Sequence, residues 1–225
     1  IDNLLSRNIE PFLTLNHWDI PLIFHEKGGW ENRDCIEYFL DYSSIVTKEF
    51  GDKVKYWITH NEPWVIANLG YNNGTHAPGS SNFYKSLEVS HNLLLSHGKA
   101  IPIIKSNSNQ SSVGIVLNLS PGMPASKSSE DLKATKLFNQ SFNEWYLCPL
   151  YGKNYPKEIT HDWIQKGLIN SIDFNKEGDL ETISRQTDFL GINYYSRAII
   201  RSEEIPEEEN LPVEIAAGDK TDFEW

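Results

Sequence analysis

The sequence has few of the features that mark secreted or membrane proteins. Its only cysteines, Cys35 and Cys148, lie far apart, so we expect neither a disulfide framework nor a paired redox motif. No apolar run approaches the ~18 residues that a transmembrane helix needs. The chain begins Ile1-Asp2-Asn3 without a charged-then-apolar signal segment. These absences favour a cytoplasmic location.

Positive charge is also scarce. The 225 residues contain 20 Lys and Arg against 31 Asp and Glu, a net charge of −11, which argues against nucleic acid or an anionic membrane as partner. No G-x-G-x-x-G segment follows an apolar run, so a dinucleotide fold is disfavoured. Aromatic residues are plentiful instead, with 7 Trp, 10 Tyr and 10 Phe. Aromatic faces of this kind suit a sugar-binding cleft, although most of them serve equally well as core residues.

Hydrophobic patterning predicts alternating strands and helices. The expected strands are continuous apolar runs rather than alternating ones, which indicates a parallel sheet buried on both faces. We predict strands at 9–15, 54–62, 112–117 and 188–195, the last continuing into 198–200. We predict helices at 1–8, 34–50, 83–106, 129–147, 157–168 and 177–185, with Asn32 or Asp34 capping the second and a capping box at 128–131.

Polar and aromatic residues cluster where each predicted strand ends. A (β/α)8 (TIM) barrel places its active site at this edge. The clusters are His17-Trp18-Asp19, Asn61-Glu62, Asn118 and Asn193-Tyr194-Tyr195. Successive strands start roughly 45 to 76 residues apart, so eight such units would need more than about 400 residues. We therefore interpret residues 1–225 as one partial TIM-barrel catalytic domain, an internal segment whose N- and C-terminal parts are missing.

Glu62 is the strongest candidate for a catalytic group. Pro63 biases it away from the α region, so its carboxylate should lie at the mouth of a strand. Trp57 and Trp64 flank it and would desolvate it in part, which suits a general acid. Taken alone, an Asn-Glu-Pro segment is more typical of a loop glutamate that caps a helix or pairs with a lysine, and the other strand ends shift the balance toward catalysis.

Three segments together resemble glycoside hydrolase family 1, the TIM-barrel β-glucosidases and β-galactosidases. They are PFLTLNHWDIP at 11–21, WITHNEP at 57–63 and DFLGINYY at 188–195. The resemblance spans essentially the whole chain, in the family's order and spacing. It implies a retaining mechanism on a small β-glycoside or oligosaccharide, with neither metal nor cofactor.

The resemblance also implies a role for each strand-end residue. Glu62 would be the general acid/base, and Asn61 would hold the sugar 2-hydroxyl. His17 would bind another sugar hydroxyl, with Trp18 beside it in the pocket wall. Tyr195 would donate a hydrogen bond to the nucleophile carboxylate, and Asn193 would support the hydrogen bonds around that carboxylate. Asn118 would face the leaving-group side of the substrate.

The sequence lacks the motif that would supply the catalytic nucleophile. The family's nucleophile is the Glu of an Ile/Val-Thr-Glu-Asn-Gly motif, which this sequence lacks. The closing Asp222-Phe223-Glu224-Trp225 is too near the fourth strand to be the family's last barrel strand, so we interpret it as a connection. The nucleophile should then lie outside this chain, and the chain alone would be an inactive sugar-binding fragment. A metal-dependent hydrolase using His17, Asp19, His60 and Glu62 is a further, disfavoured reading.

Overall fold

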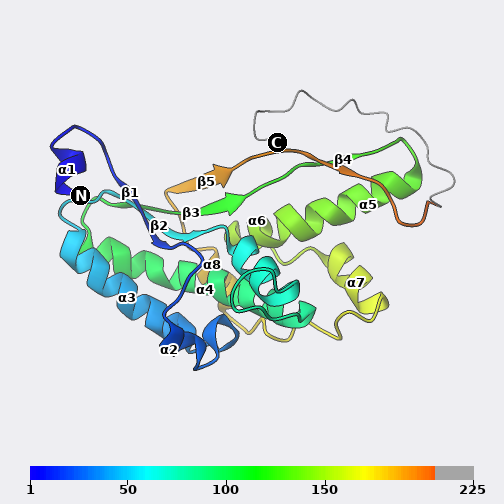
Figure 1. Ribbon diagram of the computed structural model, residues 1–225, viewed down its shortest axis with the longest axis horizontal. Helices are drawn as coiled ribbons and strands as arrows, with labels where there is room; N and C mark the ends of the chain where they lie inside the picture. The colour runs from blue at the N-terminus through cyan, green and yellow to red at the C-terminus, as the bar shows by residue number, and fades with distance from the viewer. Residues whose placement is uncertain (206–225) are drawn as a thin grey trace.

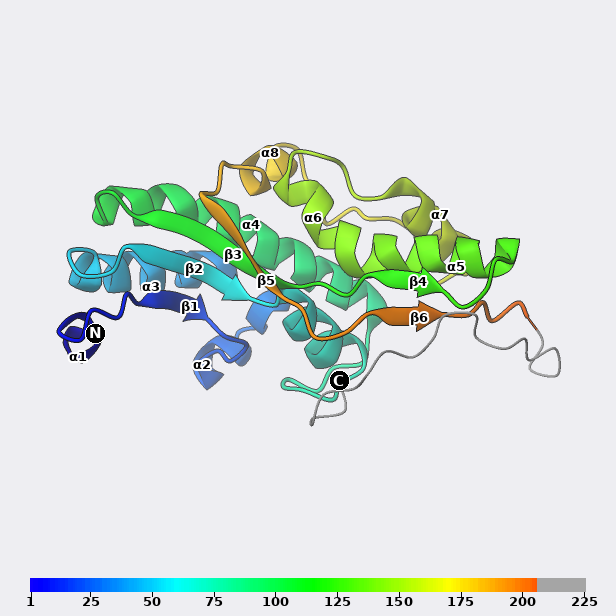
Figure 2. The ribbon, with the colours of Figure 1, turned by 90° about the horizontal axis from the view of Figure 1, so that it is seen from above.

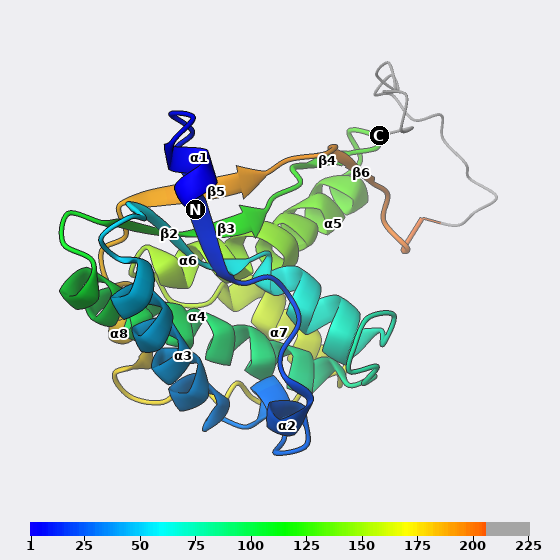
Figure 3. The same cartoon turned by 60° about the vertical axis from the view of Figure 1, so that its left-hand side comes forward.

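The computed structural model describes residues 1–205, which form a parallel sheet with helices on one face (Figures 1 and 3). The sheet order is β1-β2-β3-β5, and all three pairings are parallel, as predicted. The strands are β1 (Phe12–Asn16), β2 (Tyr56–Asn61), β3 (Ser112–Asn118) and β5 (Phe189–Asn193). Helix α3 (Cys35–Phe50) connects β1 to β2, and α4 (Phe83–Asn107) connects β2 to β3.

A second, two-stranded sheet lies beyond the ends of β3 and β5 (Figure 2). Its strands are β4 (Gly122–Pro124) and β6 (Ala198–Ile200), which pair in parallel. The prediction of one strand running through 188–200 is therefore wrong. β5 ends at Asn193, and the chain regains strand geometry only where β4 offers it a partner.

The six predicted helices are present, although the first covers only Asp2–Leu5, and the structure adds three short helical segments. The remaining elements are α1 (Asp2–Leu5), α2 (Leu22–His25), the 3-10 helix η1 (Gly29–Glu31), the π-helix η2 (Val65–Asn72), α5 (Ser129–Asn139), the π-helix η3 (Gln140–Glu144), α6 (Trp145–Leu150), α7 (Lys157–Gln165) and α8 (Asp179–Ile183). The single helix predicted at 129–147 is thus interrupted by a π-helical turn and continues to Leu150. The helical segments α2, η1 and η2 were not predicted, and η2 begins three residues after Glu62.

Helix starts follow local capping chemistry. Asn82 Oδ1 accepts from Lys85 N at 3.0 Å, and Ser128 Oγ accepts from Asp131 N at 3.1 Å. The expected capping box is only half formed, because the Asp131 carboxylate accepts from the Ser126 hydroxyl and the Ser202 N–H instead. Asp131 thereby ties the start of α5 to the end of β6. At α3, Asn32 accepts from the N–H of Asp34, and the Asp34 side chain makes no cap bond.

The hydrophobic core lies between the sheet and the helices. Helix α4 runs through its centre and contributes many of its buried side chains. The opposite, open face of the sheet carries Phe12, which is 56% exposed and stacks on Tyr56 at 4.2 Å, and Ile192, which is 57% exposed. The expectation that both faces are buried is therefore not met by the described residues.

A buried ionic cluster joins three helical segments. Asp179 of α8 accepts hydrogen bonds from Arg33, which precedes α3, and from His91 Nε2 of α4 at 3.0 Å. Burial by itself would raise the pKa of Asp179, but hydrogen bonds from Arg33, the Lys176 N–H and His91 outweigh burial and hold the pKa below its usual range. The cluster fixes the helical layer on which the sheet rests.

Two further sequence predictions concern membrane-spanning helices and the last residues of the chain. Among residues 1–205, no helix combines the length and the apolar character that crossing a membrane requires. The segment Asp222-Phe223-Glu224-Trp225 lies outside the described residues, so its interpretation as a connection stays a prediction.

Candidate active site

The carboxyl ends of the four parallel strands meet at one edge of the sheet. β1, β2, β3 and β5 end there on an asparagine each, namely Asn16, Asn61, Asn118 and Asn193. His17 and Trp18 follow the first of these, and Glu62 follows the second. The strand order therefore brings the predicted site residues to a single edge, as the sequence analysis expected.

A β-bulge in β2 decides which side chains reach this edge. Ile58 pairs with Gly114 and Asn61 with Val116, so three steps along β2 match two along β3. The extra residue means that Thr59 and His60 both point into the helical layer, where they contact His97 and Ser96 of α4. Strict alternation would have turned Asn61 toward the helices.

The bulge instead places Asn61 on the open face, within a polar network that spans three strands. Asn61 Nδ2 lies 3.5 Å from His17 Nε2, and Asn61 Oδ1 accepts from Asn193 Nδ2 at 3.1 Å. The same Asn193 amide donates to Glu62 Oε1 at 2.6 Å. Four of the predicted residues, from β1, β2 and β5, are thereby joined into one constellation.

Glu62 is held firmly at the centre of this network. Its N–H donates to the Val116 carbonyl at 2.8 Å, its φ is 50°, and it is only 5% exposed. Glu62 is thus outside the right-handed α region, but its left-handed backbone is not the extended conformation that a following proline favours, so Pro63 does not account for it. A buried carboxylate with an amide donor is suited to holding and releasing a proton at a fixed point.

The expected flanking of Glu62 by Trp57 is wrong. Trp57 lies at the other end of β2, where its indole N–H donates to the Val54 carbonyl at 3.1 Å. Trp64 lies in the helical segment after Glu62, and its ring packs against Phe142 at 4.7 Å. Five strand residues span roughly 16 Å, which removes Trp57 from the surroundings of the carboxylate.

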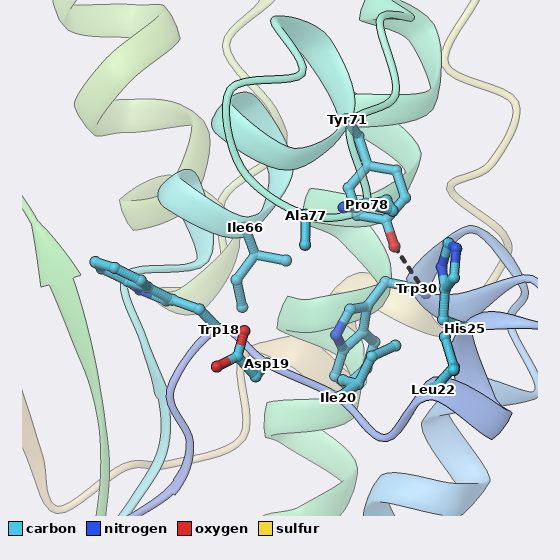
Figure 4. Close-up of a pocket in the computed structure, with 10 residues that line it drawn as sticks. All are labelled: Trp18, Asp19, Ile20, Leu22, His25, Trp30, Ile66, Tyr71, Ala77 and Pro78. Carbon is cyan, nitrogen blue, oxygen red and sulfur yellow. Dashed lines mark hydrogen bonds between the residues drawn. The ribbon is translucent and has the colours of Figure 1, made fainter.

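Trp18 lies beside His17 at the end of β1. It has a φ of 77°, and its ring lies 5.0 Å from that of His17 and 5.5 Å from that of His76. Sequence reasoning gave His76 no role, since no motif links the loop at 70–80 to β1. Beside Trp18, a cavity of about 170 Å³ extends past Asp19 to Trp30 (Figure 4). The backbone N–H of Trp30 donates to the Tyr71 hydroxyl at 3.4 Å.

Asn118 and Tyr195 lie at the same edge but are less closely tied to the network. Asn118 is in register with Asn193. Within residues 1–205, however, no hydrogen bond joins the Asn118 side chain to the network of His17, Asn61, Glu62 and Asn193. Tyr195 is 56% exposed and lies two positions after the end of β5, not on the strand as expected.

The geometry disfavours the metal-site reading. His60 Nδ1 lies 3.2 Å from Asn16 Oδ1 and its Nε2 lies 2.7 Å from Ser96 Oγ, so both ring nitrogens are engaged on the helical side, away from Glu62. In the part of the chain that is described, no three His, Cys, Asp or Glu side chains group in a way that could hold a metal ion.

Comparisons with known proteins agree with this site. The glycosyl hydrolase family 1 model matches residues 1–224. β-Glucosidase A of Acetivibrio thermocellus is 42% identical over 224 residues, covering 99% of this chain and 49% of that protein. A 1,4-β-D-glucan glucohydrolase of Thermotoga neapolitana is 40% identical over 203 residues, covering 89% and 46%.

Solved structures show the same relationship. The β-glucosidase from Exiguobacterium marinum has a TM-score of 0.88 at 37% identity, covering 99% of this chain and 50% of that one. The Thermotoga maritima β-glucosidase in complex with glucoimidazole has a TM-score of 0.84 at 36% identity, covering 100% and 49%. The chain thus spans about half the length of these relatives, and its strands are half of a TIM barrel. The chain belongs to glycosyl hydrolase family 1.

Proposed function

We propose that the protein containing this chain is a retaining β-glycosidase of the β-glucosidase type, with Glu62 as its general acid/base. The observation that carries this proposal is the buried Glu62 carboxylate held by Asn193 at 2.6 Å, beside Asn61 and His17. The names of the relatives support the choice of a β-glucoside as substrate.

The reaction has two steps that use the same carboxyl group. Glu62 protonates the glycosidic oxygen while a second carboxylate, about 5–5.5 Å away and outside this chain, attacks the anomeric carbon and forms a glycosyl-enzyme. The aglycone leaves as an alcohol. Glu62 then takes a proton from water, and the water oxygen attacks the anomeric carbon. The bond from that carbon to the second carboxylate breaks, which releases the sugar and restores both carboxyl groups.

The neighbouring residues would bind the sugar around this centre. Asn61 holds the 2-hydroxyl, a contact that strengthens in the oxocarbenium-like transition state. His17 binds another hydroxyl, and the Trp18 ring provides an apolar wall. Asn118 would face the leaving group, and Tyr195 would contact the nucleophile carboxylate.

The proposed function also includes the partners of the protein and its location in the cell. The substrate is a small β-glycoside or oligosaccharide, and no nucleic acid, membrane or cofactor takes part. The proposed cytoplasmic location is supported by two free thiols, Cys35, which is buried, and Cys148.

The test is hydrolysis of an aryl β-D-glucoside by the full-length protein, followed by NMR of the sugar formed first. We expect the β-anomer, activity that a chelator leaves unchanged, and no turnover by the 225-residue chain alone. An α-anomer as first product contradicts the retaining mechanism, and chelator-sensitive activity revives the metal reading. Turnover by the 225-residue chain contradicts a nucleophile outside it.

A further inference from the structure

His60 is a second buried polar residue beside the site, and neither the fold nor the proposed chemistry accounts for it. It is fully buried, with its ring stacked on Phe39 at a centroid distance of 4.5 Å. Its Nδ1 lies 3.2 Å from Asn16 Oδ1, at the end of β1, and its Nε2 lies 2.7 Å from Ser96 Oγ in α4. One side chain therefore bridges two strands and a helix.

The direction of these hydrogen bonds follows from Asn16. Its Nδ2 donates to the Asp19 carbonyl at 3.1 Å, so its Oδ1 faces His60 as an acceptor. His60 Nδ1 must then carry the ring proton, which leaves Nε2 bare to accept from the Ser96 hydroxyl. Ser96 Oγ also lies 2.8 Å from the Leu93 carbonyl, but only donation to His60 satisfies the ring.

The bonds form a single donor-to-acceptor series that runs from Ser96 through His60 and Asn16 to Asp19. Burial, with a smaller contribution from nearby His97, holds the pKa of His60 well below its usual range, so the ring stays neutral and the series keeps one direction.

The series of hydrogen bonds ends at the turn from Asn16 to Asp19, which carries His17 and Trp18, the two residues proposed to contact the sugar. The Asn16 side chain donates to the Asp19 carbonyl, and the Asp19 N–H donates to the His17 carbonyl at 3.0 Å. Trp18, between them, has a φ of 77°, a conformation that a non-glycine residue keeps only when its surroundings hold it there.

We propose that His60 is a positioning residue for substrate binding: through Asn16 it fixes the turn that presents His17 and Trp18 to the sugar. The bulge in β2 links this function to the catalytic strand, because the same extra residue sends His60 toward Asn16 and turns the next residue, Asn61, toward His17. This inference rests on the proposed function, since it assigns a role in binding the same substrate.

The decisive variant is His60→Leu in the full-length protein. With the bond to Asn16 lost, KM for an aryl β-D-glucoside should rise on the order of tenfold, while kcat changes less. The Kd of glucoimidazole should rise by a similar factor. The matched control is Thr59→Val, which removes the neighbouring bond from β2 to His97 of α4 and leaves the series from Ser96 to Asp19 intact. It should lower the thermal midpoint without changing KM.

Two further variants separate positioning from general stability. His60→Asn places an amide N–H near the position of Nδ1 and should recover part of the lost affinity. Asn16→Ala should raise KM, and combining it with His60→Leu should add nothing further, because both act through one contact.

The outcomes distinguish this inference from the proposed function. If wild-type protein neither hydrolyses β-glucosides nor binds glucoimidazole, the proposed function is wrong. If wild-type is active but His60→Leu lowers only the thermal midpoint and leaves KM and Kd unchanged, His60 is purely structural and the inference is wrong. If His60→Leu fails to fold, an unchanged KM in Asn16→Ala overturns the inference equally well.

Discussion

His97 makes stability depend on pH in a way that can be worked out from its surroundings. It is fully buried in α4, with Nδ1 2.8 Å from Thr59 Oγ1, and no ion pair within residues 1–205 compensates a charge on its ring. Burial lowers the pKa of His97 to about 3. In the unfolded chain its pKa returns to about 6.5.

The sign follows from which state binds the proton. Below pH ~6.5 the unfolded chain takes up a proton that the folded protein refuses, so stability is fully present above this pH and is lost as the pH falls toward 3. The slope approaches about 1.4 kcal/mol per pH unit. Between pH 7.5 and pH 5 the loss from His97 alone sums to about 2 kcal/mol.

His97→Asn tests this value, because an amide can still bond to Thr59 but cannot take a proton. We expect urea unfolding, followed by tryptophan fluorescence, to show a pH dependence about 2 kcal/mol smaller in the variant between pH 7.5 and pH 5. His91 contributes equally in both proteins, and the low pKa of His60 is held mainly by burial, with only a smaller contribution from His97, so both largely cancel in the difference. Equal pH dependence in variant and wild type would refute the reasoning.

Three further substitutions probe the site and the helical layer. Asn193→Ala removes the hydrogen-bond donor that orients Glu62, a bond worth about 0.5–1.5 kcal/mol, so kcat/KM should fall roughly 2- to 10-fold. Gly98→Ala would bring a Cβ to 2.0 Å from the Thr182 carbonyl, and the forced separation of α4 from α8 should cost at least about 1–3 kcal/mol of unfolding free energy. Asp179→Ala leaves the buried His91 Nε2 without its acceptor and should cost about 1–3 kcal/mol, measured by urea unfolding.

Each of these has a neighbouring control. Tyr194→Phe, beside Asn193 and 59% exposed, should leave kcat/KM nearly unchanged. Lys99→Ala, beside Gly98, should cost less than about 1 kcal/mol, and so should Lys166→Ala, which breaks an ion pair away from the Asp179 cluster in which the lysine is exposed. A control that matches its paired variant would contradict the specific contact proposed for that position.

Sequence reasoning located the strands and their ends because both leave local signals. Continuous apolar runs mark strands covered by helices, and the polar residues at their ends can share only one edge of a parallel sheet. Glu62 was identifiable for this reason, and so were Asn61, His17 and Asn193, which the structure joins in one network.

The features that were missed depend on pairing between distant segments. The bulge at Thr59 and His60 appears only when β2 is matched against β3, since a single extra residue leaves no pattern in the chain itself. The break before β6 depends on β4 as a new partner. His76 reaches Trp18 through a loop, and the contact becomes visible only in three dimensions.

The most direct test of the central claim is the kinetics of Glu62→Ala in the full-length protein. For a β-glucoside with a poor leaving group, loss of the general acid should lower kcat/KM by about 10²- to 10⁴-fold. An activated aryl β-glucoside needs little protonation, so its first step should be nearly normal, and azide should restore turnover by replacing water in the second step and give the β-glucosyl azide. Undiminished hydrolysis of the poor substrate, or no effect of azide on a slowed variant, would contradict the assignment of Glu62 as acid/base.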